Sequence, residues 1–284
     1  MTIQWHEVSG APSMTALYVK AATRRKISGK TLPEQGLRQV LQVDPQRLAA
    51  YRKVCGFAEN GLLPPTYPHV LAFALQMQLL TDRDFPFPLL GLIHLNNRIR
   101  VLRPMGGVNQ VRASVNVENL QPHAKGAVFD LVTRLEDQLG LLWQAHSQML
   151  CRGVELDGTP LADTPANSLA LMEVAHWRAP ADIGRQYAKV SGDYNPIHLS
   201  AASAKLFGFP TAIAHGLWNK ARTLAALDQH LPEANLEIEV AFKKPVRLPS
   251  EVTLLASAAG SSGDLRLMGA GDLEHMVGGW RPAG

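Results

Sequence analysis

The residues best suited to chemistry lie in one short stretch, Tyr187 to His198, which reads YAKVSGDYNPIH. Pro196 fixes its own φ and disfavours the α region for Asn195, so the backbone must turn, and a turn lets Asp193 and His198 converge. A carboxylate and an imidazole suit general acid and base work on a water or hydroxyl near neutral pH. We therefore predict that Asp193 and His198 hold a water, and that Asn195 orients the loop or that water.

Ordinary loop chemistry offers an alternative for each of these residues. A Gly-Asp turn followed by Asn-Pro lets the Asp and Asn side chains cap backbone groups, with His198 at the surface or at the start of a helix. Short motifs of this kind also produce false positives. The conjunction of Asp193, Asn195 and His198 within one turn favours the chemical interpretation.

The stretch resembles the signature of the MaoC-like, hydratase 2 type (R)-specific enoyl-CoA hydratases and dehydratases. The matching positions are Tyr187, Ser191, Gly192, Asp193, Asn195, Pro196, Ile197, His198 and Ala202. The resemblance continues through Phe207-Gly208 and Pro210-Thr211 to Ile213-Ala214-His215-Gly216-Leu217, which is similar to the start of the family's central hot-dog helix.

The resemblance implies a site and a reaction. In that family an Asp and a His form the catalytic dyad, and a backbone N–H at the Gly of a His-Gly pair binds the thioester oxygen. By position these are Asp193, His198 and Gly216. The implied activity is a hydro-lyase that adds water reversibly to trans-2-enoyl thioesters and forms (R)-3-hydroxyacyl thioesters of CoA or acyl carrier protein. Neither a metal nor a redox cofactor is expected.

Two other functions fit parts of the sequence. A hot-dog acyl-CoA thioesterase would need its carboxylate at the thioester carbonyl, whereas the Asp-x-Asn-Pro-x-His grouping suits proton transfer at the α carbon and the β oxygen. A catalytically silent acyl-CoA-binding protein would not need an intact pair of Asp193 and His198. The thioesterase is therefore the alternative function.

Composition limits the classes of partner. The chain has 284 residues, 46% of them hydrophobic, which suffices for one large or two ordinary domains. The net charge of +4 is mild and does not demand a nucleic acid. Cys55 and Cys151 are far apart, so neither a disulfide framework nor a zinc site is expected. With no leader pattern and no long apolar run, we expect a cytoplasmic protein without a membrane partner. The sequence leaves open whether it forms a homodimer.

The first half is expected to hold a strand at 15–22, a helix from Gln46 to Cys55 that ends at Gly56, and a nearly all-apolar helix from His69 to Leu80. Glycine after the last periodic residue is a usual helix stop. A helix that is apolar on all sides is expected to be buried. Three alternating segments then predict a meander of strands at 111–117, 127–135 and 141–150.

After a Pro-, Thr- and Asp-rich stretch at 157–167, the expected linker, the same plan repeats. A second long helix is predicted from His215 to Leu231, together with a strand at 174–178, a helix at 180–190 and strands at 237–242, 252–258, 265–270 and 273–280. The predicted fold class is α+β. The predicted domains are an N-terminal degenerate unit at 1–156 and a C-terminal catalytic unit at 168–284.

The two halves also share sequence similarity. The segment from Tyr51 to Gly56 aligns with the segment from Tyr187 to Gly192 at an offset of 187 − 51 = 136 residues, which indicates duplication of one unit. The resemblance implies the same architecture, a double hot-dog of two tandem units, each a long helix wrapped by an antiparallel sheet. It also implies a degenerate N-terminal half that makes room for longer acyl chains.

The offset places Phe57 opposite Asp193 and Leu62 opposite His198, so the first half lacks the acid and the base. Phe57 and Leu62, with Ala72 in the first long helix, are the predicted acyl-binding residues. Ordinary core packing is an equally good account of them, because a pocket wall and a core look alike in a sequence.

His215 stands beside Gly216 at the predicted start of the second long helix. Helix capping or packing is the favoured interpretation of this histidine, because the family uses the neighbouring backbone N–H rather than the imidazole.

Overall fold

The computed structural model describes residues 3–10, 12–160 and 171–284. The N-terminal unit contains β1 (Gln4–Glu7), α1 (Met14–Thr23), β2 (Gln35–Gln42), α2 (Pro45–Cys55), α3 (Tyr67–Leu80), η1 (Leu89–Gly91), β3 (Leu92–Val101), β4 (Gln110–His123), β5 (Gly126–Asp137) and β6 (Gly140–Arg152). The C-terminal unit contains β7 (Met172–Ala179), α4 (Ile183–Ser191), η2 (Pro196–His198), α5 (Ala201–Lys205), α6 (Gly216–Ala226), β8 (Leu236–Phe242), β9 (Ser250–Ala256), β10 (Gly263–Met268) and β11 (Glu274–Pro282).

All strands join one 11-stranded sheet in the order β1-β2-β4-β5-β6-β3-β8-β11-β10-β9-β7. The order from β2 to β3 matches, in mirror image, the order from β8 to β7. When β1 is left out, each unit uses its first, third, fourth, fifth and second strands in turn, counted from the outer end of the sheet. The units meet where β3 pairs antiparallel with β8. This repeated topology is the double hot-dog fold that the sequence predicted.

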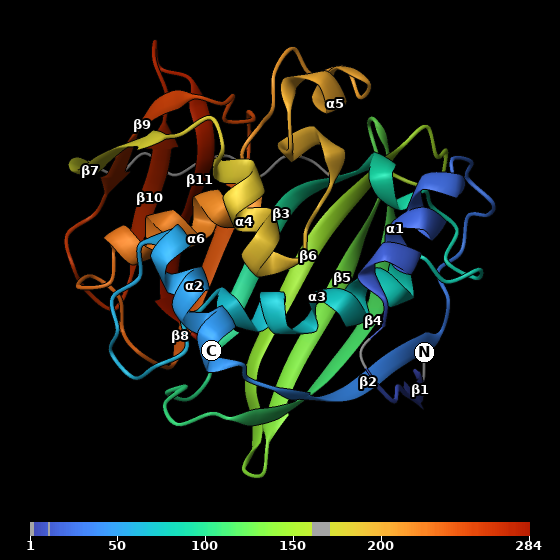
Figure 1. Ribbon diagram of the computed structural model, residues 1–284, viewed down its shortest axis with the longest axis horizontal. Coiled ribbons are helices and arrows are strands. Elements are labelled where there is room, and N and C mark those ends of the chain that lie inside the picture. The colour runs from blue at the N-terminus through green and yellow to red at the C-terminus, as the bar shows by residue number, and fades with distance from the viewer. Residues whose placement is uncertain (1–2, 11, 161–170) are drawn as a thin grey trace.

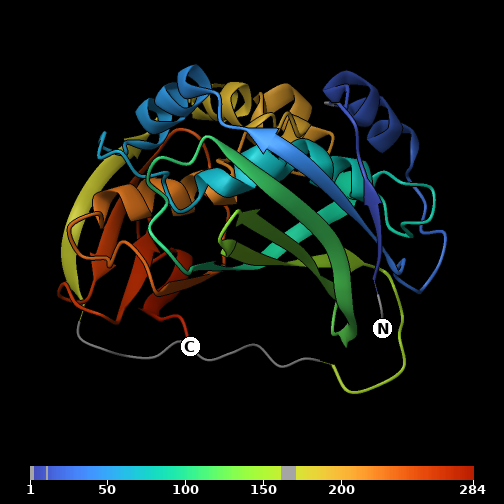
Figure 2. The same cartoon turned by 90° about the horizontal axis from the view of Figure 1, so that it is seen from below.

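The helices lie on one side of the curved sheet, with α3 across the strands of the N-terminal unit and α6 across those of the C-terminal unit (Figure 1). The view from below shows the sheet curving beneath the helical layer (Figure 2). Ten of the fourteen residues of α3 are buried, as its almost wholly apolar sequence predicts. No helix in the described ranges is long and apolar enough to cross a membrane.

The helices α2 and α4 occupy equivalent places in the two units and pack against each other. Asp44 caps α2 by accepting hydrogen bonds from the N–H groups of Gln46 and Arg47. Both helices end at a left-handed glycine, Gly56 with φ 82° and Gly192 with φ 86°. Because both helices end at an equivalent glycine, the sequences of α2 and α4 can be aligned at their C-termini.

One predicted element is wrong, and several others differ in extent. The segment 15–22 was expected to be a strand but is the helix α1, because Leu17 and Ala21 are one helical turn apart and are its buried residues. β1, β2 and the start of β3 carry too little alternation to be predicted. The helix α6 ends at Ala226, before Leu231. Most of the predicted linker at 157–167 lies outside the described residues, and the domain boundaries stay a prediction.

Candidate active site

The loop after α4 holds Asp193 in place through its own backbone. Ser191 Oγ accepts from the N–H of Asp193 at 3.1 Å, and Asp193 Oδ1 accepts from the N–H of Asn195 at 3.1 Å. The side chain of Asn195 in turn accepts from the N–H of Ile197 and begins η2. Asn195 therefore contributes a hydrogen bond within the loop, and its role in orienting the loop or a water stays a prediction.

His198 lies at the end of η2 and is only 8% exposed. Its Nδ1 is 2.8 Å from the carbonyl oxygen of Ile213, and since a carbonyl only accepts, Nδ1 carries the proton. The second ring nitrogen, Nε2, consequently has a free lone pair. Close approach of η2 to α4 requires Gly184, because a Cβ there would collide with the carbonyl oxygen of His198.

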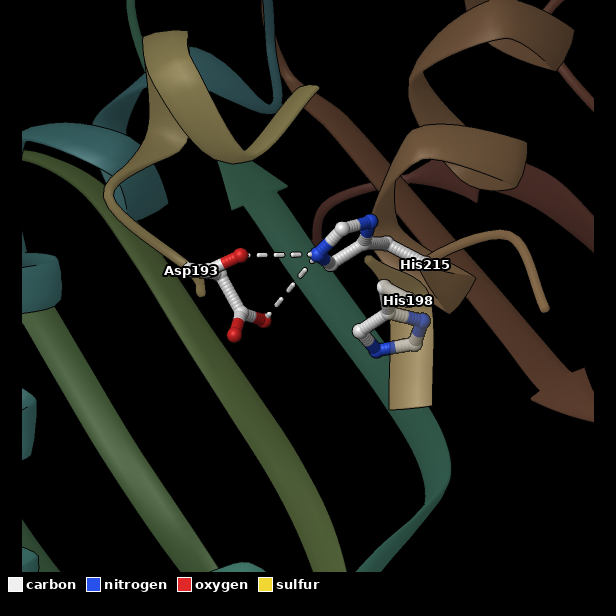
Figure 3. Close-up of side chains that lie close together, drawn as sticks. All are labelled: Asp193, His198 and His215. Atoms are coloured by element: carbon white, nitrogen blue, oxygen red, sulfur yellow. Dashed lines mark hydrogen bonds and ion pairs between the residues drawn. The ribbon is translucent and has the colours of Figure 1, made fainter. Parts of the chain in front are cut away.

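His215 completes the cluster. Its ring stacks on the His198 ring with centroids 3.7 Å apart and an interplanar angle of 27°. Its Nε2 lies 2.9 Å from the carbonyl oxygen of Asp193 and 3.8 Å from Asp193 Oδ2 (Figure 3). The expectation of packing is confirmed, while the side chain makes no capping hydrogen bond to α6. His215 instead ties the acid-bearing loop to the start of α6.

Burial sets the charge state of both histidines. It lowers the pKa of His198 to about 3, and the neighbouring His215 adds to that lowering. Burial also lowers the pKa of His215 to about 4. Both rings are therefore neutral near pH 7. A neutral His198 with its proton on Nδ1 can act as a base through Nε2.

The N-terminus of α6 begins at Gly216, directly after His215. The first N–H groups of a helix have no intrahelical partner, and no side chain caps this end. A Cβ at Gly216 would lie 3.1 Å from the Phe242 ring, so the position favours glycine. Free N–H groups at a helix N-terminus suit an oxygen that gains negative charge.

Asp193, His198 and His215 each offer a ligand atom within 4.8 Å of the other two. Two observations argue against a metal at this cluster. The imidazoles stack face to face, so their in-plane lone pairs run side by side instead of converging. In addition, His215 Nε2 faces a backbone carbonyl and must carry a proton. The cluster is better suited to holding a water.

The structure thus gathers Asp193, His198 and Asn195 beside Gly216 at one end of α6. The three predicted acyl-binding residues lie in the N-terminal unit. Phe57 stacks on Tyr51 with ring centroids 6.3 Å apart. Leu62 forms an isolated bridge with Gly106, and Ala72 is a fully buried core residue. Their role in acyl binding stays a prediction.

Sequence reasoning missed three side chains of the N-terminal unit that support the site. Arg47 donates to the carbonyl oxygens of Val190 and Ser191 at 2.8 and 3.0 Å, which satisfies the end of α4. The Phe73 ring faces Gly192, and the Tyr18 hydroxyl bonds to the residues around Asp193. No local pattern could have revealed these contacts, because they join residues more than a hundred positions apart.

Comparisons with known proteins point to one family. A family model described as "MaoC like domain" matches residues 164–271. The chain is 38% identical over 229 residues to 3-hydroxyacyl-thioester dehydratase X of Mycobacterium tuberculosis, covering 80% of this chain and 81% of that protein. It is 27% identical over 168 residues to peroxisomal enoyl-CoA hydratase 2 of Arabidopsis thaliana, covering 54% of each.

Solved structures show the same relationship. The crystal structure of HtdX from Mycobacterium tuberculosis aligns with a TM-score of 0.76 and 34% identity over 87% of this chain and 99% of that one. A MaoC-like dehydratase from Phytophthora capsici aligns with a TM-score of 0.73 and 20% identity over 89% and 95%, which shows the fold.

Fold and site together define a lyase of the double hot-dog class, with an acid–histidine pair at the start of one central helix. The chain belongs to the MaoC-like dehydratase family, of the hydratase 2 type.

Proposed function

We propose that the chain catalyses the reversible hydration of trans-2-enoyl thioesters to (R)-3-hydroxyacyl thioesters, with Asp193 and His198 as the catalytic pair. The observation that carries the proposal is the unprotonated Nε2 of His198 close to the Asp193 carboxylate, beside the free N–H groups of α6. The similarity to proteins named dehydratase and enoyl-CoA hydratase supports the same reaction.

The pair binds one water between them. The carboxylate of Asp193 accepts one O–H of the water, and Nε2 of His198 takes the other proton as the water oxygen bonds to the β carbon. The electron pair of the double bond moves to the thioester oxygen, where the N–H of Gly216 stabilises the enolate. The imidazolium then returns its proton to the α carbon. Both additions occur on one face, so hydration is syn.

Spectrophotometry with crotonyl-CoA tests the reaction. A hydratase consumes the conjugated enoyl absorbance without releasing thiol, whereas a thioesterase releases free CoA thiol. Chiral separation of the product should give the (R)-3-hydroxy isomer, and an (S) product would contradict the mechanism. Structural likeness to acyl-ACP thioesterases, such as one from Bacteroides thetaiotaomicron at 12% identity and a TM-score of 0.57, concerns the fold alone.

The carrier and the cellular setting belong to the proposal as well. The substrate is an acyl thioester, and activity on matched CoA and acyl carrier protein thioesters would identify its carrier. Cytoplasmic localisation and a homodimer remain predictions, which cell fractionation and light scattering would test.

A further inference from the structure

Helix α1 lies outside the strand and helix plan that the two units share, because it precedes β2, the first strand of that plan in the N-terminal unit. Ser13 caps it by accepting from the N–H of Ala16 at 3.4 Å. Only Leu17 and Ala21 of its ten residues are buried. The helix packs beside the end of α3 (Figure 1). Its apolar face is therefore small, and its polar contacts require a separate explanation.

Those contacts are made by Tyr18 on the catalytic loop. The phenol oxygen accepts from the N–H of Tyr194 at 2.6 Å. The hydroxyl has two acceptors within reach, the carbonyl oxygen of Gly192 at 3.1 Å and Asp193 Oδ1 at 3.4 Å. The Tyr18 and Tyr194 rings also meet edge to face with centroids 6.4 Å apart. One side chain of α1 thus contacts three consecutive residues of the loop.

The contact distinguishes the two oxygens of the catalytic acid. Asp193 Oδ1 accepts from the N–H of Asn195 and faces the Tyr18 hydroxyl, whereas Oδ2 lies on the side of His215 at 3.8 Å. Engagement of Oδ1 leaves Oδ2 to receive the water. Burial raises the pKa of Tyr18, and the charge of Asp193 raises it further, so the phenol remains a donor.

We propose that Tyr18 is a positioning residue of the hydration reaction, which holds the loop and the Asp193 carboxylate so that Oδ2 faces the water shared with His198. This inference rests on the roles proposed above for Asp193 and His198. It assigns a function to α1, a helix outside the repeated plan, as part of the support of the active site.

The test is Tyr18→Phe, assayed by hydration of crotonyl-CoA. Phenylalanine keeps the ring contact with Tyr194 and removes only the hydroxyl, so the variant is expected to fold. We expect kcat to fall about tenfold with KM within about twofold, because the lost hydrogen bonds orient the acid without touching the substrate.

Two controls separate positioning from stability. Thr81→Val removes a buried hydroxyl that donates to the carbonyl oxygen of Met77 at 2.7 Å at the end of α3, and it should lower the melting temperature while leaving kcat unchanged. Val19→Ala changes an exposed residue of α1 and should alter neither quantity. Unchanged kcat in Tyr18→Phe would overturn the proposal. A loss of kcat no larger than the one Thr81→Val causes, at an equal loss of melting temperature, would overturn it as well.

A double-mutant cycle with Asp193→Ala completes the test. If Tyr18 acts through Asp193, its removal should change the residual rate less than about twofold once Asp193 is alanine. A full tenfold effect in that background would refute positioning through Asp193. The same cycle separates the two proposals. High activity of the single variant Asp193→Ala would refute the catalytic pair. A loss of kcat in Asp193→Ala without a loss of kcat in Tyr18→Phe would refute only the role of Tyr18.

Discussion

The two units differ most in how each holds the loop that follows its first helix. In the N-terminal unit the buried guanidinium of Arg52 donates to the carbonyl oxygens of Ala58 and Leu62, so α2 secures its own loop. The position equivalent to Arg52 in the C-terminal unit is Ala188, which offers no such group. The loop there is held from outside by Tyr18, Arg47 and His215. The comparison teaches that one scaffold can carry either a loop held by its own helix or a loop held by groups from other elements, and the second is the one proposed to bind water.

Removal of the acid or the base from the C-terminal unit should have the largest effect on the hydration rate. Asp193→Asn and His198→Ala should each reduce the hydration rate by about 10² to 10⁴, the usual contribution of a positioned acid or base. Because both groups act on one water, the double variant should be far from additive. Kinetics with crotonyl-CoA would measure the loss, and near wild-type turnover of either folded variant would contradict the assignment.

A buried lysine lies at the junction between the units. Lys220 of α6 is fully buried, and its Nζ donates to the carbonyl and side-chain oxygens of Asn97 on β3 and to the carbonyl of Ile238 on β8. Lys220→Met should lower the free energy of unfolding by about 1 to 3 kcal/mol, because buried acceptors lose their donor.

Denaturant unfolding would measure the change at Lys220. Lys53→Met, on exposed surface of α2, is the matched control. An equal free energy of unfolding for Lys220→Met and the wild type would mean that the junction between the units does not require this lysine.

The N-terminal unit should influence chain length rather than chemistry. Ala74, His69 and Phe73 on α3 keep accessible surface, whereas Ala72 does not. If α3 borders the acyl chain, Ala74→Trp should raise KM for long enoyl thioesters several-fold and leave crotonyl-CoA nearly unchanged.

The competing account of this part of α3 is a solid core. Overpacking a core typically costs about 1 to 3 kcal/mol and would depress activity on all substrates together. Ala113→Phe, which fills a fully buried position of β4, provides that pattern as a reference. Equal losses of Ala74→Trp on short and long substrates, with a lowered melting temperature, would exclude the pocket.

Each unit also contains two histidines whose pKa is lowered most by desolvation: His69 to about 4 and His94 to about 3, and His198 to about 3 and His215 to about 4. The unfolded chain binds protons on them below about pH 6.5, whereas the folded chain does not until near pH 4. Stability is therefore present above pH 6.5 and falls as the pH drops toward 4.

Unfolding at pH 5 should accordingly take up protons. His94→Gln should reduce the uptake by about one proton. Calorimetry in buffers of different ionisation enthalpy would measure the uptake, and an unchanged value for His94→Gln would show that His94 is not neutral in the folded state.

Features that depend on neighbouring residues could be predicted from the sequence. Gly56 and Gly192 stop their helices, the apolar run of α3 is buried, and the alternating segments are strands. Helix α1 was mistaken for a strand because its β-branched and aromatic residues suit either conformation and only burial of Leu17 and Ala21 decides between them. Within the site, Asp193 and His198 lie in one turn and could be found together.

The sequence by itself therefore indicated the proposed catalytic loop, the repeat and the family, because the residues involved are neighbours or repeat at a constant offset. Only the tertiary structure decided which groups hold that loop. Tyr18 and Arg47 reach it from the other unit, and His215 reaches it from the start of α6. Packing across the junction between the units brings these groups together. Because they lie far apart along the chain, no local sequence pattern reveals that they are close in space.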